Sequence, residues 1–140
     1  METRGAGEDS EQLWKLLRDS LKSASDYSRK LRFGLSSLAE QFEAGDIAPA
    51  LPKLSSILEG INWLIGVYDR CRFFLAAPIR VEEESIVQSK LLEALKHLVA
   101  LVEDGDMDGA AWITRNELTP RVETLILRIE ELSRRRIAPQ

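Results

Sequence analysis

The sequence predicts an all-α protein, an antiparallel up-down-up-down four-helix bundle made of two related helical hairpins. Apolar residues recur three and four positions apart along four long stretches, which is the spacing of one helix face. A turn motif at residues 42–47 recurs at residues 102–107. The composition also favours helix, because Leu, Glu, Arg, Ala and Ser outweigh Val, Thr and the aromatic residues.

The repeated motif reads as a short turn between two helices. Gly45 and Gly105 can take the left-handed conformation that ends a helix, and Asp46 and Asp106 can cap the helix that follows. The flanking apolar residues match as well: Leu31, Leu35, Leu38, Ala50 and Leu58 around the first turn correspond to Leu91, Leu95, Leu98, Ala110 and Leu118 around the second. The sequence therefore indicates an internal duplication of one helical hairpin.

The first hairpin begins after a polar stretch at residues 1–8, which we expect to be a disordered tail before a single domain at residues 9–137. A helix at about 9–44 follows. Its apolar stripe consists of Trp14, Leu17, Leu21, Ala24, Ser28, Leu31, Leu35, Leu38 and Phe42. Gly34 interrupts this helix and suits close approach by a neighbour.

A second helix, at about 47–77, is the most apolar part of the chain. Pro49 falls in its first turn, where a missing N–H does no harm, whereas Pro52 delays or bends its start. The apolar arc is wider than one helix seam requires. This width has two readings, burial among the other helices or a surface shared with a second molecule.

The second hairpin follows Pro78, with helices expected at about 82–104 and 107–136. Pro120 lies inside the last helix, where it removes a hydrogen bond and crowds Asn116. We expect it either to kink that helix or to split it.

Charge and composition limit the classes of function. The chain has 140 residues with 19 basic and 23 acidic side chains, and this net charge of −4 argues against nucleic-acid binding. No stretch approaches the roughly 20 apolar residues of a membrane span. The single Cys71, in an apolar neighbourhood, indicates a buried core residue in a reducing compartment. We expect a cytoplasmic protein.

The residues that carry enzyme chemistry are too few. One His and one Cys cannot form a metal centre, and the chain has no phosphate-binding loop. His97 and Cys71 are better explained as structural residues than as a nucleophile and its base. We therefore expect no enzyme activity, no metal and no cofactor.

Large aromatic residues are the remaining candidates, since they anchor many interfaces. The candidate partner-binding surface consists of Trp63, Tyr68, Phe73, Phe74 and Trp112. The leading hypothesis is a non-enzymatic bundle that acts by protein–protein interaction, through self-association or a protein partner. The alternative is a small-molecule-binding regulatory bundle with an apolar pocket near Trp63, Tyr68 and Trp112.

A local pattern adds a resemblance. Residues 95–106 read Leu-x-x-Leu-Val-x-Leu-Val-Glu-x-Gly-Asp and precede Asn-Glu-Leu-Thr-Pro-Arg-Val-Glu at residues 116–123. This resembles small uncharacterised bacterial helical-bundle proteins in which a Glu-Leu-x-Pro segment follows a Gly-Asp turn. It is also loosely similar to the flagellin-export chaperones, four-helix proteins that bind a partner's helical tail. The resemblance implies protein binding and no catalysis. A flagellar export chaperone-like protein that binds a partner's helical tail is therefore a further alternative function.

Overall fold

The computed structural model describes residues 4–74 and 81–137, with side chains over 11–73 and 86–134. These residues form α1 (Arg4–Glu43), α2 (Ile47–Phe74), α3 (Val81–Glu103), α4 (Met107–Ile113), the π-helical turn η1 (Thr114–Leu118) and α5 (Thr119–Ile137). The last three segments follow one another without a break and make one long helix. No strand occurs in the described part of the chain, so the all-α prediction is confirmed.

The first helix begins earlier than expected. Helix α1 begins at Arg4 rather than at residue 9, so residues 4–8, expected in a disordered tail, are helical, while residues 1–3 lie outside the described part. Residues 75–77, the expected end of the second helix, also lie outside it.

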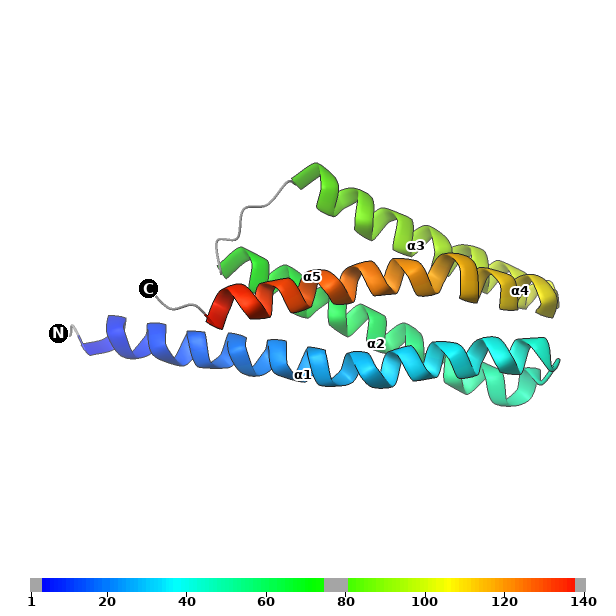
Figure 1. Cartoon of the computed structure of the whole chain (residues 1–140), viewed down its shortest axis with the longest axis horizontal. Helices are drawn as coiled ribbons and strands as arrows, with labels where there is room; N and C mark the ends of the chain where they lie inside the picture. Colours follow the sequence, from blue (N-terminus) through cyan, green and yellow to red (C-terminus); the bar gives the residue numbers. More distant parts are fainter. Residues whose placement is uncertain (1–3, 75–80, 138–140) are drawn as a thin grey trace.

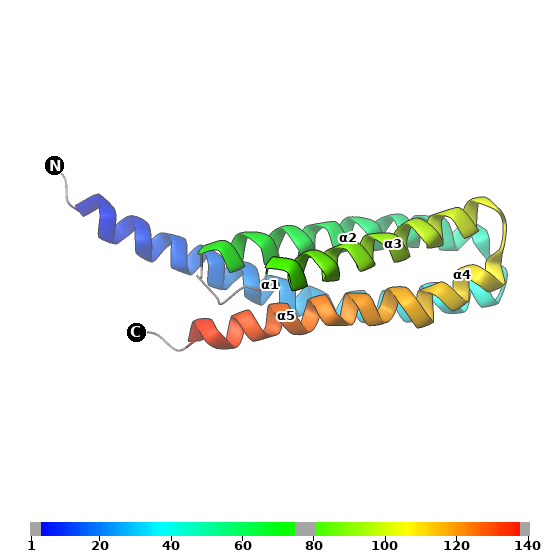
Figure 2. The ribbon, with the colours of Figure 1, turned by 90° about the horizontal axis from the view of Figure 1, so that it is seen from above.

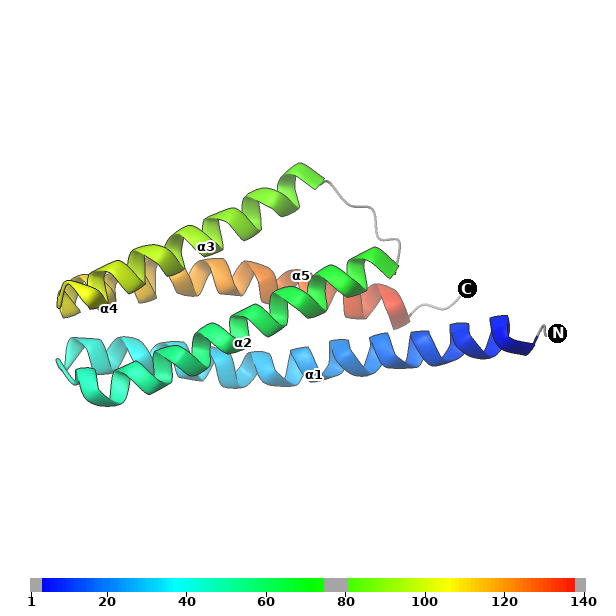
Figure 3. The same cartoon turned by 180° about the vertical axis from the view of Figure 1, so that it is seen from behind.

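The helices lie lengthwise beside one another. Both turns are at one end of the molecule, and α2 runs away from them whereas α3 returns toward them (Figure 2). Helix α1 packs on α2, α4 and α5, and α3 packs on α4 and α5. Contact between α2 and α3 is sparse. Toward its beginning, α3 diverges from the other helices (Figures 1 and 3).

The core follows the apolar stripes that the sequence predicts. The largest fully buried side chains come from every helix, and they are Leu21, Leu31, Leu35, Leu38 and Phe42 of α1, Ile61 and Leu64 of α2, Leu91 and Leu98 of α3, and Leu118, Leu125 and Ile126 of the last helix. Cys71 is buried as expected, and burial raises the pKa of its thiol, which leaves it protonated and unreactive.

The two turns have the same backbone geometry. Gly45 has a φ of 75° and Gly105 a φ of 76°, the left-handed conformation that a side chain disfavours. Each turn carries the same pair of N–H donors at corresponding positions: Gly45 to Phe42 O at 3.0 Å and Asp46 to Gln41 O at 2.9 Å, and Gly105 to Val102 O at 3.1 Å and Asp106 to Leu101 O at 2.9 Å. These bonds satisfy carbonyl groups that the helix ends leave open.

Only one of the two predicted aspartate caps forms. The Asp106 carboxylate accepts a hydrogen bond from the Gly109 N–H at 2.8 Å and so caps α4. The residue corresponding to Gly109 in the first hairpin is Pro49, which has no N–H to donate. Asp106 therefore serves as a helix cap. Asp46 cannot accept the equivalent hydrogen bond, because Pro49 has no N–H.

Pro120 neither splits the last helix nor leaves it a regular α-helix. The chain widens into the π-helical turn η1 immediately before it, and the Thr119 N–H donates to the Thr114 carbonyl, five residues back. The Thr119 hydroxyl donates to the same oxygen at 2.6 Å. A wider turn suits a residue that cannot donate to the carbonyl four residues before it and whose ring would crowd that carbonyl.

Candidate binding surfaces

The candidate aromatic residues do not form one surface. Tyr68 is only 5% exposed and belongs to the core, whereas Trp63 is 41% and Trp112 57% exposed. Trp63 lies midway along α2, Phe73 is exposed at the end of α2 away from the turns, and Trp112 lies on α4 beside the turns (Figure 2). The side chain of Phe74 lies outside the described part of the chain.

Trp63 instead packs with a residue that the sequence did not single out. The rings of Trp63 and Tyr27 of α1 meet edge to face, with 5.8 Å between their centroids. Tyr27 lies directly on the backbone of Gly60, where an added Cβ would be 2.6 Å from Tyr27 Cζ. Burial, and secondly the charge of Glu59, raise the pKa of the Tyr27 phenol, so it stays a neutral donor.

A hollow of about 480 Å³ opens between α1 and the first half of α2. Its lining residues are Tyr27, Lys30, Leu31, Gly34 and Gln41 of α1 and Pro49, Pro52, Lys53, Ser56 and Ile57 of α2. We call this the α1–α2 hollow. Tyr27 and Ser56 also line a second depression beside Trp63, so Tyr27 bounds the hollow at the end away from the turns. Gly34 helps to leave the hollow open, because it has no side chain where the two helices face each other.

The polar groups of the α1–α2 hollow are poorly matched by the protein. Its charged lining residues are Lys30 and Lys53, and neither forms an ion pair with any described residue. The side-chain oxygen Oε1 of Gln41 is buried and accepts no hydrogen bond from the described residues. A signal for this face was present in the sequence, because Tyr27, Gly34 and Gln41 recur seven positions apart beside the core stripe.

A second surface lies along the edge between α2 and α3. Gln88 of α3 donates to Asp69 of α2 at 2.8 Å, and Arg72 donates to the same oxygen at 3.0 Å. The two helices run in opposite directions (Figure 2), and Leu58 and Ile65 of α2 are partly buried against the core. Apart from this hydrogen bond, contact between α2 and α3 is sparse.

The α3 side of this edge forms a continuous patch on one helix. Leu92, Leu95, Lys96, Val99, Ala100 and Glu103 together line a depression of about 300 Å³, and we call them the α3 patch. Leu92 is 49% exposed, and Leu95 and Val99 are partly exposed. One cation and one anion flank the apolar residues.

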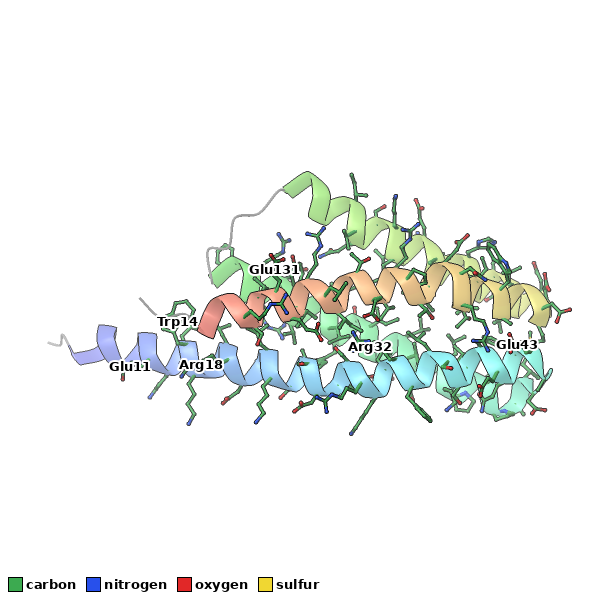
Figure 4. All side chains as sticks on the ribbon, in the orientation of Figure 1. Glu11, Trp14, Arg18, Arg32, Glu43 and Glu131 are labelled. Carbon is green, nitrogen blue, oxygen red and sulfur yellow. The ribbon has the colours of Figure 1, made fainter. Side chains whose placement is uncertain are left out.

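Ion pairs between described residues join α1 to the last helix. Arg32 donates to Glu123 of α5 with 2.9 Å between Nε and Oε1, and Arg115 of η1 donates to Glu43 at 2.8 and 2.9 Å. Figure 4 shows Arg32 and Glu43 on the side of α1 that faces the last helix. Hydrogen bonding to the guanidinium lowers the pKa of each carboxyl group. Both arginines are thus engaged within the protein.

Other candidates for chemistry are dispersed. His97 is exposed on α3, away from the buried Cys71. Among the described residues, no three His, Cys, Asp or Glu side chains converge in a way that could hold a metal ion. Each described helix is too short or too polar to cross a membrane.

Comparison with known proteins identifies a family. A family model for a domain of unknown function, DUF8042, matches residues 19–127, which include both turns and both binding surfaces. No curated protein matches the chain, and no solved structure does. The expected similarity to flagellin-export chaperones therefore has no support from these comparisons.

Proposed function

The chain belongs to the DUF8042 family, whose function is unknown, and we propose that it is a non-enzymatic cytoplasmic protein that acts by self-association. The interface is the α3 patch together with the exposed apolar edge of α2, and its occupant is a second copy of this chain. The observation that carries the proposal is the self-complementary arrangement of the patch.

An interface with twofold symmetry uses the same surface on both copies, so that surface must be complementary to itself. The α3 patch meets this condition when α3 packs antiparallel on α3 of a second copy. If the twofold axis passes between Val99 and Ala100, Lys96 lies opposite Glu103 of the other copy, and the reverse pair forms at the same time. Ala100 allows close approach at the centre.

The architecture supports the same surface. We propose that the two hairpins derive from one duplicated helix pair and pack as an antiparallel up-down-up-down bundle that is incompletely closed between α2 and α3. The matching φ angles and hydrogen bonds of the two turns support the duplication. Contact between α2 and α3 is sparse, Leu51 of α2 is exposed, and Leu58 and Ile65 are only partly buried, so a second copy can cover what these residues leave exposed.

Size-exclusion chromatography with light scattering tests this proposal. The expected molar mass is twice the 15.8 kDa of one chain, falling to that of one chain in Leu92→Glu. Leu127→Glu is the matched control, because Leu127 is a similarly exposed leucine on α5, outside the patch. Circular dichroism confirms that each variant remains helical. A wild-type protein that stays monomeric at millimolar concentration overturns the proposal.

Charge reversal tests the pairing itself. Lys96→Glu places Glu opposite Glu at both ends of the twofold interface and should weaken the dimer at least about tenfold. The double variant Lys96→Glu/Glu103→Lys restores opposite charges and should restore the dimer. A double variant that dissociates as readily as the single one contradicts this geometry.

A further inference from the structure

We propose that the α1–α2 hollow is a binding site for a small organic anion with an apolar body, such as an alkyl or aryl carboxylate. The site is independent of the self-association surface, since it is formed by α1 and the opposite side of α2.

The size and shape of the hollow indicate a compact ligand. Its volume of about 480 Å³ falls within the ~300–1,000 Å³ typical of small-molecule sites. Tyr27 bounds one end, where its ring lies on Gly60 and against Trp63.

The charge of the ligand follows from the two lysines. Lys30 and Lys53 come from different helices and line the same hollow, and Glu59 lines only the neighbouring depression. Two ammonium groups without ion-pair partners among the described residues favour an anionic group between them. The apolar body lies against Leu31, Ile57 and the proline rings of α2.

Gln41 supplies an independent indication of a ligand. A buried amide oxygen without a donor destabilises the free protein, and buried polar groups in folded proteins nearly always have a partner. Gln41 also lines the hollow, so a rotation of its side chain would turn this oxygen toward a hydroxyl or amide group on the ligand, and the Tyr27 hydroxyl offers a further donor at the other end.

Nuclear magnetic resonance with sodium decanoate as the probe tests the proposal. Addition of decanoate below its micelle concentration should shift the amide signals of Gly34 and Lys53 and the indole N–H signal of Trp63, saturably. Decyltrimethylammonium has the same chain with a cationic head and should not produce these shifts. Equal shifts with both amphiphiles, shifts scattered over the surface, or no saturable shift each overturn the proposal.

Variants identify the groups responsible. Lys30→Ala/Lys53→Ala should weaken decanoate binding about tenfold, whereas Lys22→Ala, an exposed lysine of α1 outside the hollow, should leave it unchanged. Gly34→Leu fills the hollow from its floor and should abolish binding while the protein stays folded by circular dichroism. Binding that survives both the lysine and the glycine substitutions contradicts the site. A monomeric protein that still binds decanoate separates this inference from the proposed self-association.

A 4-hydroxybenzoate probe tests the role assigned to Gln41, because it adds a hydroxyl donor at the end opposite its carboxylate. Gln41→Leu should weaken 4-hydroxybenzoate binding several-fold more than benzoate binding. The same variant should unfold at a higher urea concentration than the wild type, since it removes an unpaired buried acceptor. Equal losses for the two probes, or a lower unfolding midpoint, contradict this role.

Discussion

Gly60→Ala should destabilise the protein even though alanine is the better helix former. In an unobstructed helix this substitution stabilises by about 1 kcal/mol. Here the new methyl group would overlap the Tyr27 hydroxyl and lie 2.6 Å from Tyr27 Cζ. Tyr27 must leave its position and lose its edge contact with Trp63. Overpacking costs about 1–3 kcal/mol and the ring contact about 0.5–1.5 kcal/mol, so we expect a net loss of about 1–3 kcal/mol.

The sign of the effect should reverse when Tyr27 is removed. In a Tyr27→Ala background, Gly60→Ala should stabilise by about 1 kcal/mol, because only the helix propensity remains. Gly34→Ala is the matched control in the wild type, since its methyl group would meet Ile57 Cδ1 at an ordinary 3.7 Å, and it should stabilise. Urea unfolding followed by circular dichroism measures the wild type, Tyr27→Ala, the double variant and the two single glycine variants. If Gly60→Ala stabilises with Tyr27 present, the packing of Tyr27 on α2 described here is wrong.

Four further substitutions test other contacts. Arg32 lowers the pKa of Glu123 below its ordinary value of 4.5, so the carboxylate stabilises the fold above that pH and the stabilisation disappears as pH falls through the lowered pKa. Urea unfolding from pH 7 to 3 should therefore show that Glu123→Gln loses less stability in acid than the wild type. An unchanged pH profile would contradict this. Asp106→Ala should lower the free energy of unfolding by about 1 kcal/mol through loss of the α4 cap, and Asp46→Ala should lower it by less than about 0.5 kcal/mol. Thermal unfolding of the two variants measures both losses. Equal losses would contradict the conclusion that only Asp106 caps its helix. Gly105→Ala should lower the free energy of unfolding by about 1–2 kcal/mol, because the φ of Gly105 is positive. Urea unfolding measures this loss, and no loss would exclude the left-handed conformation of Gly105 in solution.

The helical periods of the sequence were sufficient to predict which residues form the core. Leu31, Leu35, Leu38 and Phe42 are buried as their spacing indicates, and both Gly-Asp motifs are turns. These features depend on local sequence, which is why they could be predicted. The effect of Pro120 could be narrowed only to a kink or a split, because the π-helical turn η1 depends on how the carbonyl groups before the proline find partners.

The candidate surfaces were harder to predict, because exposure depends on how helices are arranged. Tyr68 and Trp63 are both aromatic residues of α2, yet one is in the core and the other is at the surface. The composition of α2 indicated an excess of apolar residues, but it did not indicate which of them face the core and which lie at the surface. Tyr27, Lys30 and Gln41 lie beside the core stripe of α1. They line the α1–α2 hollow only because α2 packs against α1, and this packing could not be read from the sequence of α1.

A distance measurement between two copies tests the central claim, that the α3 patch is the surface for self-association. One protein carries a spin label at Lys96→Cys, and a second protein carries it at Lys22→Cys of α1. Both have a Cys71→Ala background. Electron dipolar spectroscopy gives the distance between the two labels of a dimer. We predict a short distance from position 96, beside the twofold axis, and a much longer one from position 22. A shorter distance from position 22, or no dipolar coupling from either, would contradict the claim.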